Sequence, residues 1–147
     1  MKDPFLKPVI LGGILIALLS VIFAPGIFLW AITGGYLTVK AASKALNDVV
    51  TFMDGLLLGV FSGILGGVCL DMLAVISFNT SENHRLLLKT LEMNWPKDIQ
   101  QPLNINAMLP SILFITCILI ILISVIFSVI GSSCGVLLAK KKMSQKS

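Results

Sequence analysis

The chain has 147 residues, of which 56% are hydrophobic and only 12% are charged. A soluble domain usually carries about 25% charged residues, so this chain has too few to cover a globule with polar side chains. The same composition excludes disordered, collagen-like and disulfide-rich proteins. Because the apolar residues occur in blocks long enough to cross a bilayer, we expect an all-α, polytopic membrane protein with a single domain over residues 1–147.

The first apolar block covers residues 8–39 and is interrupted by Pro25-Gly26. One continuous helix of this length would reach about 48 Å, whereas the hydrocarbon core of a bilayer is about 30 Å thick. Proline removes a backbone donor, and glycine permits a tight turn. The break therefore predicts two antiparallel spans, at about 8–24 and 27–45.

Two alternatives exist for this block. A cleaved signal peptide is disfavoured because Ile22 is large and Pro25 would follow the cut after Ala24. A single kinked helix over 8–39 would leave three spans and place the two termini on opposite sides of the membrane.

The remaining apolar blocks predict a third span at 49–78, capped by Asp48 or Asp54, and a fourth at 110–139 that begins at Pro110. Residues 79–109 form the only long polar stretch and are expected to be an extracytoplasmic loop. The loop contains an amphipathic pattern over 82–94 that predicts a short interfacial helix. Its apolar face comprises Leu87, Leu88, Leu91 and Trp95.

Basic residues fix the expected orientation. Eight lysines fall on one side of the four-span arrangement, four of them in the basic tail at 140–147 and the others at Lys2, Lys7, Lys40 and Lys44. Only Arg85, Lys89 and Lys97 fall on the other side. Such an excess in short segments marks the cytoplasmic side, which predicts a protein of the cell membrane with both termini in the cytoplasm. Because the lysines flank apolar blocks and form no basic stripe, no nucleic-acid partner is expected.

Small residues recur every four positions in the third span. Gly55, Gly59, Gly63 and Gly67 form this series, which we call the glycine strip. Small residues let membrane helices approach closely and gain dispersion contacts. Small residues also recur on the other spans, namely Gly13, Ala17, Ala31, Gly35, Ser124, Ser128 and Ser132. The strip is therefore interpreted as a helix-packing face, and contact within the bundle and contact with another subunit both remain open.

A resemblance rests on Gly34-Gly35-Tyr36, which is followed after a short polar link by Asp54-Gly55 and the glycine repeat. This order resembles small glycine-rich four-helix membrane proteins of prokaryotes, over residues 9–75. The resemblance implies a prokaryotic multi-pass protein and supplies no activity, cofactor or functional residue. The loop at 79–109 has no counterpart in that pattern.

Apart from Asp54 at the capping position, Asp71 is the only acidic residue placed within a predicted span. Acidic residues in membranes usually face the bundle or a wet cavity, so Asp71 is a candidate polar site. When depth in the membrane is estimated for the other spans, Thr33 and Thr116 lie near the level of Asp71. They are therefore candidate hydrogen-bond partners for it. Three interpretations remain: a neutral Asp71 joining two helices, an ionised Asp71 at the outer interface, and a proton- or cation-binding site.

The sequence contains no catalytic, metal-binding or cofactor-binding motif, so no enzyme activity, metal or cofactor is expected. The bilayer is the expected partner, together with a second copy or a membrane-complex subunit. We therefore expect a non-enzymatic scaffold, accessory subunit or self-associating unit. The alternative is a small transporter or channel that uses Asp71. Small multidrug exporters also have four spans, but their first span carries an acidic residue and this one does not.

Overall fold

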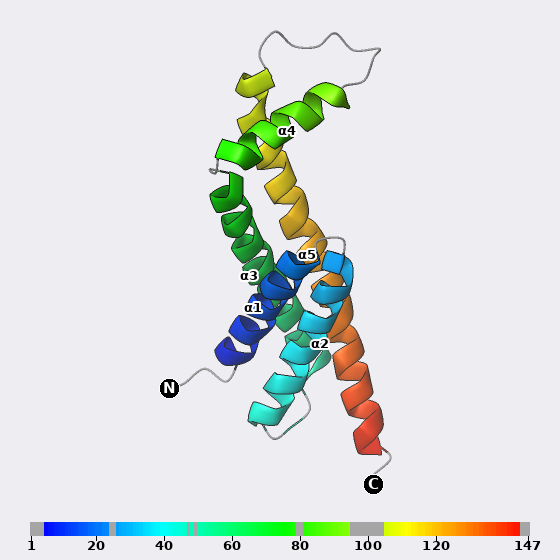
Figure 1. Cartoon of the computed structure of the whole chain (residues 1–147). Coiled ribbons are helices and arrows are strands. Elements are labelled where there is room, and N and C mark those ends of the chain that lie inside the picture. Colours follow the sequence, from blue (N-terminus) through cyan, green and yellow to red (C-terminus); the bar gives the residue numbers. More distant parts are fainter. Residues whose placement is uncertain are drawn as a thin grey trace.

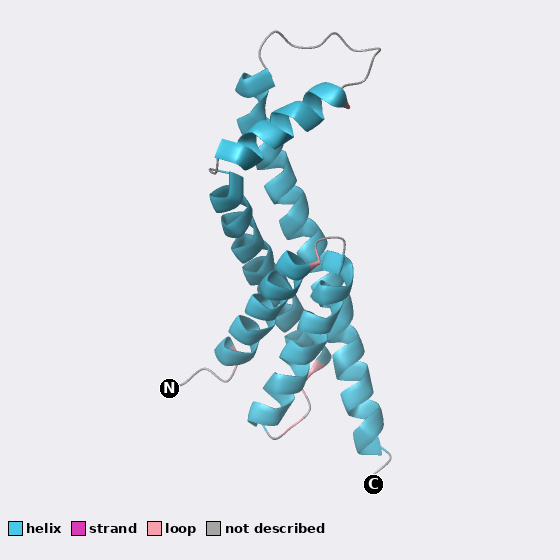
Figure 2. Ribbon diagram, in the orientation of Figure 1, coloured by secondary structure: helices cyan, strands magenta, loops and turns pink. Residues whose placement is uncertain are grey.

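The computed structural model describes residues 5–23, 26–46, 48, 50–78, 81–94 and 105–144. All of the regular structure in this part of the chain is helical, which confirms the all-α prediction (Figure 2). The five helices, in chain order, are α1 (Leu6–Ile22), α2 (Ile27–Leu46), α3 (Phe52–Phe78), α4 (Ser81–Met93) and α5 (Ile105–Ser144) (Figure 1).

The break between α1 and α2 lies where the sequence predicts it. The amide of Gly26 donates a hydrogen bond of 3.0 Å to the carbonyl of Phe23, and the indole of Trp30 donates one of 3.2 Å to the same oxygen. A Cβ atom on Gly26 would lie 2.7 Å from both the Phe23 ring and the Trp30 indole nitrogen. Glycine is therefore required for this tight connection, and the predicted helical hairpin is confirmed.

The start of α3 differs from the prediction. Thr51, and neither Asp48 nor Asp54, occupies the position before the helix, which begins at Phe52 and not at residue 49. The Thr51 hydroxyl accepts a hydrogen bond from the Asp54 amide (3.2 Å) and donates one to the Asp54 carboxylate (2.6 Å). Because the Asp54 side chain returns to the residue before the helix, the arrangement resembles a capping box.

The start of α5 was also predicted wrongly. The helix begins at Ile105, and Pro110 lies inside it. Since proline lacks an N–H, one intrahelical hydrogen bond is lost. Pro110 is the sixth residue of the helix, so the loss falls just after the first four amides, which have no intrahelical partner. At its other end α5 continues past residue 139 through Lys140 and Lys141, where positive charges interact favourably with the helix dipole.

The helices form a bundle in which α5 packs along α3 and α2, while α1 packs on α3 and α2 from another side. The start of α1 and the ends of α2 and α5 lie together at one end (Figure 1). We call this the basic end, because it carries Lys7, Lys40, Lys44, Lys140 and Lys141.

Beyond the α1–α2 turn, α3 and α5 continue as a pair toward α4 (Figure 1). The Phe28 ring, at the start of α2, meets the Phe127 ring edge-on with centroids 4.9 Å apart. Since α5 begins at Ile105, about 33 Å of this helix precedes the contact, at 1.5 Å per residue. The hairpin therefore covers α5 only over its second half.

By length and composition, two of the described helices can cross a membrane, through the stretches Phe52–Ser77 and Ala107–Lys141. Helix α1 is apolar but shorter. Helix α2 carries Lys40 and Lys44 in its last turns and is less apolar than α1, α3 and α5.

Helix α4 matches the predicted amphipathic segment in position and lies across the far end of α3 and α5 (Figure 1). Leu88 and Leu91 are half-buried, while Arg85 and Lys89 on the opposite face are exposed. The side chains of Leu87 and Trp95, also assigned to the apolar face, lie outside the described set.

We expect the amides of residues 84–92 to exchange with deuterium more slowly than in an unstructured peptide, because apolar burial of α4 holds its backbone hydrogen bonds closed. Replacing Leu88 by serine should speed this exchange. The matched control is Leu86→Ser, because Leu86 is 62% exposed and its loss should leave exchange unchanged. Peptide-like exchange in the parent protein would show that α4 is not held in place.

Candidate functional site

The glycine strip of α3 lies against α5 along its whole length. All four glycines are buried. A Cβ atom on Gly63 would lie 2.6 Å from the Cα atom of Val125, and one on Gly67 would lie 2.9 Å from the Cα atom of Ile121. A Cβ atom on Gly59 would lie 2.9 Å from the Cα atom of Val129. The two backbones therefore approach so closely that most of this face has no room for a side chain.

Asp71 is the next member of the same series, four residues after Gly67. Because α3 and α5 run antiparallel, a step of four along α3 corresponds to a step of four back along α5. The facing residues Val125 and Ile121 are thus followed by Cys117, and the Cys117 thiol is the side-chain hydrogen-bond partner of Asp71. Asp71 therefore belongs to the α3–α5 seam, the contact that begins at Gly55.

Asp71 is only 9% exposed, so it lies inside the contact between the helices. One of its oxygens, Oδ1, is fully buried and has no hydrogen-bond partner in the part of the chain that the structure describes. A buried polar atom without a partner is costly, since it has lost its hydration. The group can hold a proton or a small cation, and among the described residues the Cys117 thiol is its side-chain hydrogen-bond partner.

Thr33 and Thr116 do not join Asp71. The Thr33 hydroxyl donates to the carbonyl oxygens of Leu29 and Trp30 at 3.0 and 2.9 Å, and the Thr116 hydroxyl donates to that of Ile112 at 2.8 Å. Both side chains are exposed. The structure therefore shows no hydrogen bond from Asp71 to either threonine. A hydroxyl on a membrane helix readily satisfies itself on its own preceding turn.

Serines fill the rest of the seam. The hydroxyl groups of Ser62 and Ser128 are 2.9 Å apart and form the hydrogen bond that joins α3 to α5 near its centre. Ser124, Ser128 and Ser132 are all fully buried. Ser132 donates to the carbonyl of Val129 at 2.9 Å, while the Ser124 hydroxyl has no partner among the described residues. The seam thus contains polar atoms on several successive turns.

Other helix pairs also meet through small residues. A Cβ atom on Gly66 would lie 3.2 Å from the carbonyl oxygen of Gly13, where α3 crosses α1. Gly12 and Gly34 bring α1 and α2 together. A Cβ atom on Gly12 would lie 3.1 Å from the carbonyl oxygen of Gly34, and a Cβ atom on Gly34 would lie 3.1 Å from that of Gly12. On α5, a Cβ atom on Gly131 would overlap the Ile32 carbonyl of α2.

Comparison with known protein families, curated proteins and solved structures finds no match for this chain. Among the residues that the structure describes, no cluster of three or more histidine, cysteine, aspartate or glutamate side chains could hold a metal ion. The candidate site therefore consists of the seam and of Asp71 within it.

Proposed function

We propose that this protein is a non-enzymatic, multi-pass membrane protein that acts as a scaffold, accessory subunit or self-associating unit, with both termini in the cytoplasm. The observation that carries the proposal is the length of apolar surface on α5. At the average tilt of about 20°, a hydrocarbon core of about 30 Å takes up about 21 helical residues. If one edge of the hydrocarbon core lies at Lys140, at the basic end, the other edge lies about 21 residues earlier on α5, near Leu119.

Large apolar side chains continue on α5 beyond that level. Phe114 and Ile115 are 67% and 59% exposed, and the α1–α2 hairpin does not reach them. Apolar surface outside both lipid and protein is unfavourable, at about 25 cal/mol per Å². A partner subunit or a second copy that covers this part of α5 removes the cost.

Four spans are supported by the helix lengths and by the distribution of charge. Helices α1 and α2 have 17 and 20 residues, or about 26 and 30 Å, which suits a core of about 30 Å. The described lysines of the bundle gather at one end, as the positive-inside rule requires of a cytoplasmic face. With α3 and α5 the hairpin makes four crossings and leaves α4 on the opposite side.

Mild extraction in detergent followed by mass measurement tests this function. We expect a homo-oligomer or a complex with a second membrane protein. The change Phe114→Ser should weaken that assembly by about tenfold, since loss of a buried aromatic contact costs roughly 1–3 kcal/mol. Leu137→Ser is the matched control, because Leu137 is 59% exposed but lies near the basic end, within the lipid level. A monomer under all mild conditions would contradict the proposal.

A second candidate function rests on the unpartnered oxygen of Asp71. Asp71 faces Cys117, two residues beyond Leu119, so its carboxyl lies at the outer edge of the hydrocarbon core. A small transporter or channel would use the carboxyl there as a proton- or cation-binding group. Cation or proton flux into liposomes that contain the parent protein, abolished by Asp71→Asn, would support this function. Equal flux for both proteins would exclude it.

A further inference from the structure

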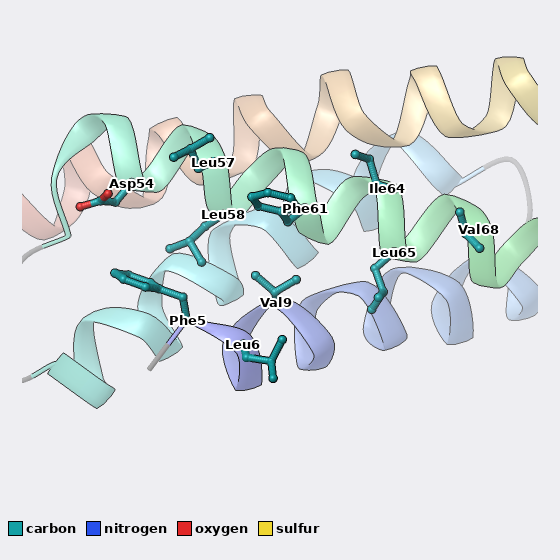
Figure 3. Close-up of a pocket in the computed structure, with 10 residues that line it drawn as sticks. All are labelled: Phe5, Leu6, Val9, Asp54, Leu57, Leu58, Phe61, Ile64, Leu65 and Val68. Atoms are coloured by element: carbon teal, nitrogen blue, oxygen red, sulfur yellow. The ribbon is translucent and has the colours of Figure 1, made fainter. Parts of the chain in front are cut away.

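A groove lies between α1 and α3 on the side of the bundle away from α5 (Figure 3). The two helices touch where Gly13 meets Leu65 and Gly66, and Figure 1 shows that they diverge toward the basic end. The divergence leaves a groove of about 590 Å³, within the range of small-ligand sites. Phe5, Leu6 and Val9 form its α1 wall.

The α3 wall of the groove runs from Leu57 through Phe61 and Ile64 to Val68. These residues follow a helical spacing of three or four and form one continuous stripe (Figure 3). From Leu57 to Val68 the helix rises about 16 Å, which equals half of a hydrocarbon core of about 30 Å. Since the groove starts at the basic end, its apolar part spans the depth of one leaflet.

The length of the groove favours one kind of occupant. A single extended acyl chain has the length of one leaflet, which matches the rise of about 16 Å along the α3 wall. A chain of this kind therefore fits the groove along its whole apolar length.

Charge at the mouth of the groove selects the headgroup. Among the described residues that line it, Asp54 is the ionisable one, and the Thr51 hydroxyl donates a hydrogen bond of 2.6 Å to its carboxylate. Lys7 follows the lining residue Leu6 in the first turn of α1 and is exposed. A carboxylate attracts an ammonium group, and a nearby lysine attracts a phosphate.

We propose that this groove binds one acyl chain of a phospholipid with an ammonium headgroup, such as phosphatidylethanolamine, in the leaflet at the basic end. The site rests on the proposed membrane insertion, because the chain enters from the bilayer. Asp54 contacts the ammonium group, Lys7 the phosphate, and the stripe from Leu57 to Val68 the hydrocarbon chain.

The full chain is reconstituted in vesicles of equal parts phosphatidylethanolamine and phosphatidylglycerol that contain a trace of either lipid with a photoreactive acyl chain. We expect cross-links from the ethanolamine probe to concentrate on residues 57–68. Ile64→Trp fills the groove and should lower this labelling about tenfold, as overpacking costs about 1–3 kcal/mol. Leu73→Trp is the matched control on α3, since Ile64 and Leu73 are 41% and 44% exposed, and it should label as the parent does.

A second variant tests the headgroup independently of the groove volume. Asp54→Asn should make the two lipid probes label residues 57–68 equally. Labelling spread evenly over the outer faces, or a preference for phosphatidylglycerol in the parent, would overturn the lipid site and leave the proposed function intact. Cross-links from 57–68 to another protein would show that a partner occupies the groove. Failure of the protein to resist alkaline extraction from the vesicles would overturn both proposals.

Discussion

Replacing Gly63 by alanine should lower the free energy of unfolding in detergent by about 2 kcal/mol, because the added methyl group meets backbone atoms and not a movable side chain. The new Cβ atom would lie 2.6 Å from the Cα atom of Val125 and 2.9 Å from the carbonyl oxygen of Ser124. To make room, α5 has to move away from α3 and weaken the Ser62–Ser128 hydrogen bond. Leucine at Gly59 or Gly63 should cost more and lower the folded yield.

The matched control is Gly135→Ala, which changes a buried glycine of α5 in the same way. A Cβ atom there would lie 3.2 Å from the Cβ atom of Val39 and 3.4 Å from both the ring and the carbonyl oxygen of Tyr36, so the neighbours need to move by only a few tenths of an ångström. Alanine is also favoured over glycine inside a helix by about 0.5–1 kcal/mol. We therefore expect Gly135→Ala to stay within about 1 kcal/mol of the parent. Equal melting of Gly63→Ala and the parent would contradict the close contact of α3 with α5.

Replacing Asp71 by asparagine should raise the free energy of unfolding near neutral pH by about 1–3 kcal/mol. The carboxylate is buried, its partner is the weak Cys117 donor, and no cation reaches it from the described residues. Asparagine has nearly the same shape but carries no charge, so its burial costs less. Denaturant titration of the purified protein measures the change.

For Asp54→Asn, on the same helix, we expect the free energy of unfolding to change in the opposite direction. Asp54 lies in the first turn of α3, where its charge interacts favourably with the helix dipole and its carboxylate accepts the Thr51 hydrogen bond. We expect this change to lower stability by about 0.5–1 kcal/mol. If Asp71→Asn also lowers stability, the Asp71 carboxylate has a counter-ion in the membrane, which would favour the transport function.

Helix positions could be predicted from the sequence because they depend on local chemistry. The break at Pro25-Gly26 and the ends of the apolar blocks mark most helices to within a few residues. The start of α5 could not be found this way. Pro110 is compatible with the first position of a helix and also with an early turn, and only the residues before it distinguish the two.

The candidate site was predicted less well. Counting residues from the helix ends gives the depth of Thr33 and Thr116 but not the direction in which each side chain points. The four-residue period of the glycine strip does carry that information. Extended by one step it reaches Asp71, and the antiparallel partner of that step is Cys117.

The arrangement of four spans is the central claim, and a set of reporter fusions tests it most directly. Fusions after Ala24, after Asp48, within residues 96–104 and at Ser147 should report outside, inside, outside and inside. This alternation follows if α1, α2, α3 and α5 each cross the bilayer, with the basic end in the cytoplasm. Matching signals at Ala24 and Asp48 would show that the α1–α2 hairpin does not span the membrane. Matching signals within 96–104 and at Ser147 would contradict the membrane crossing of α5 itself.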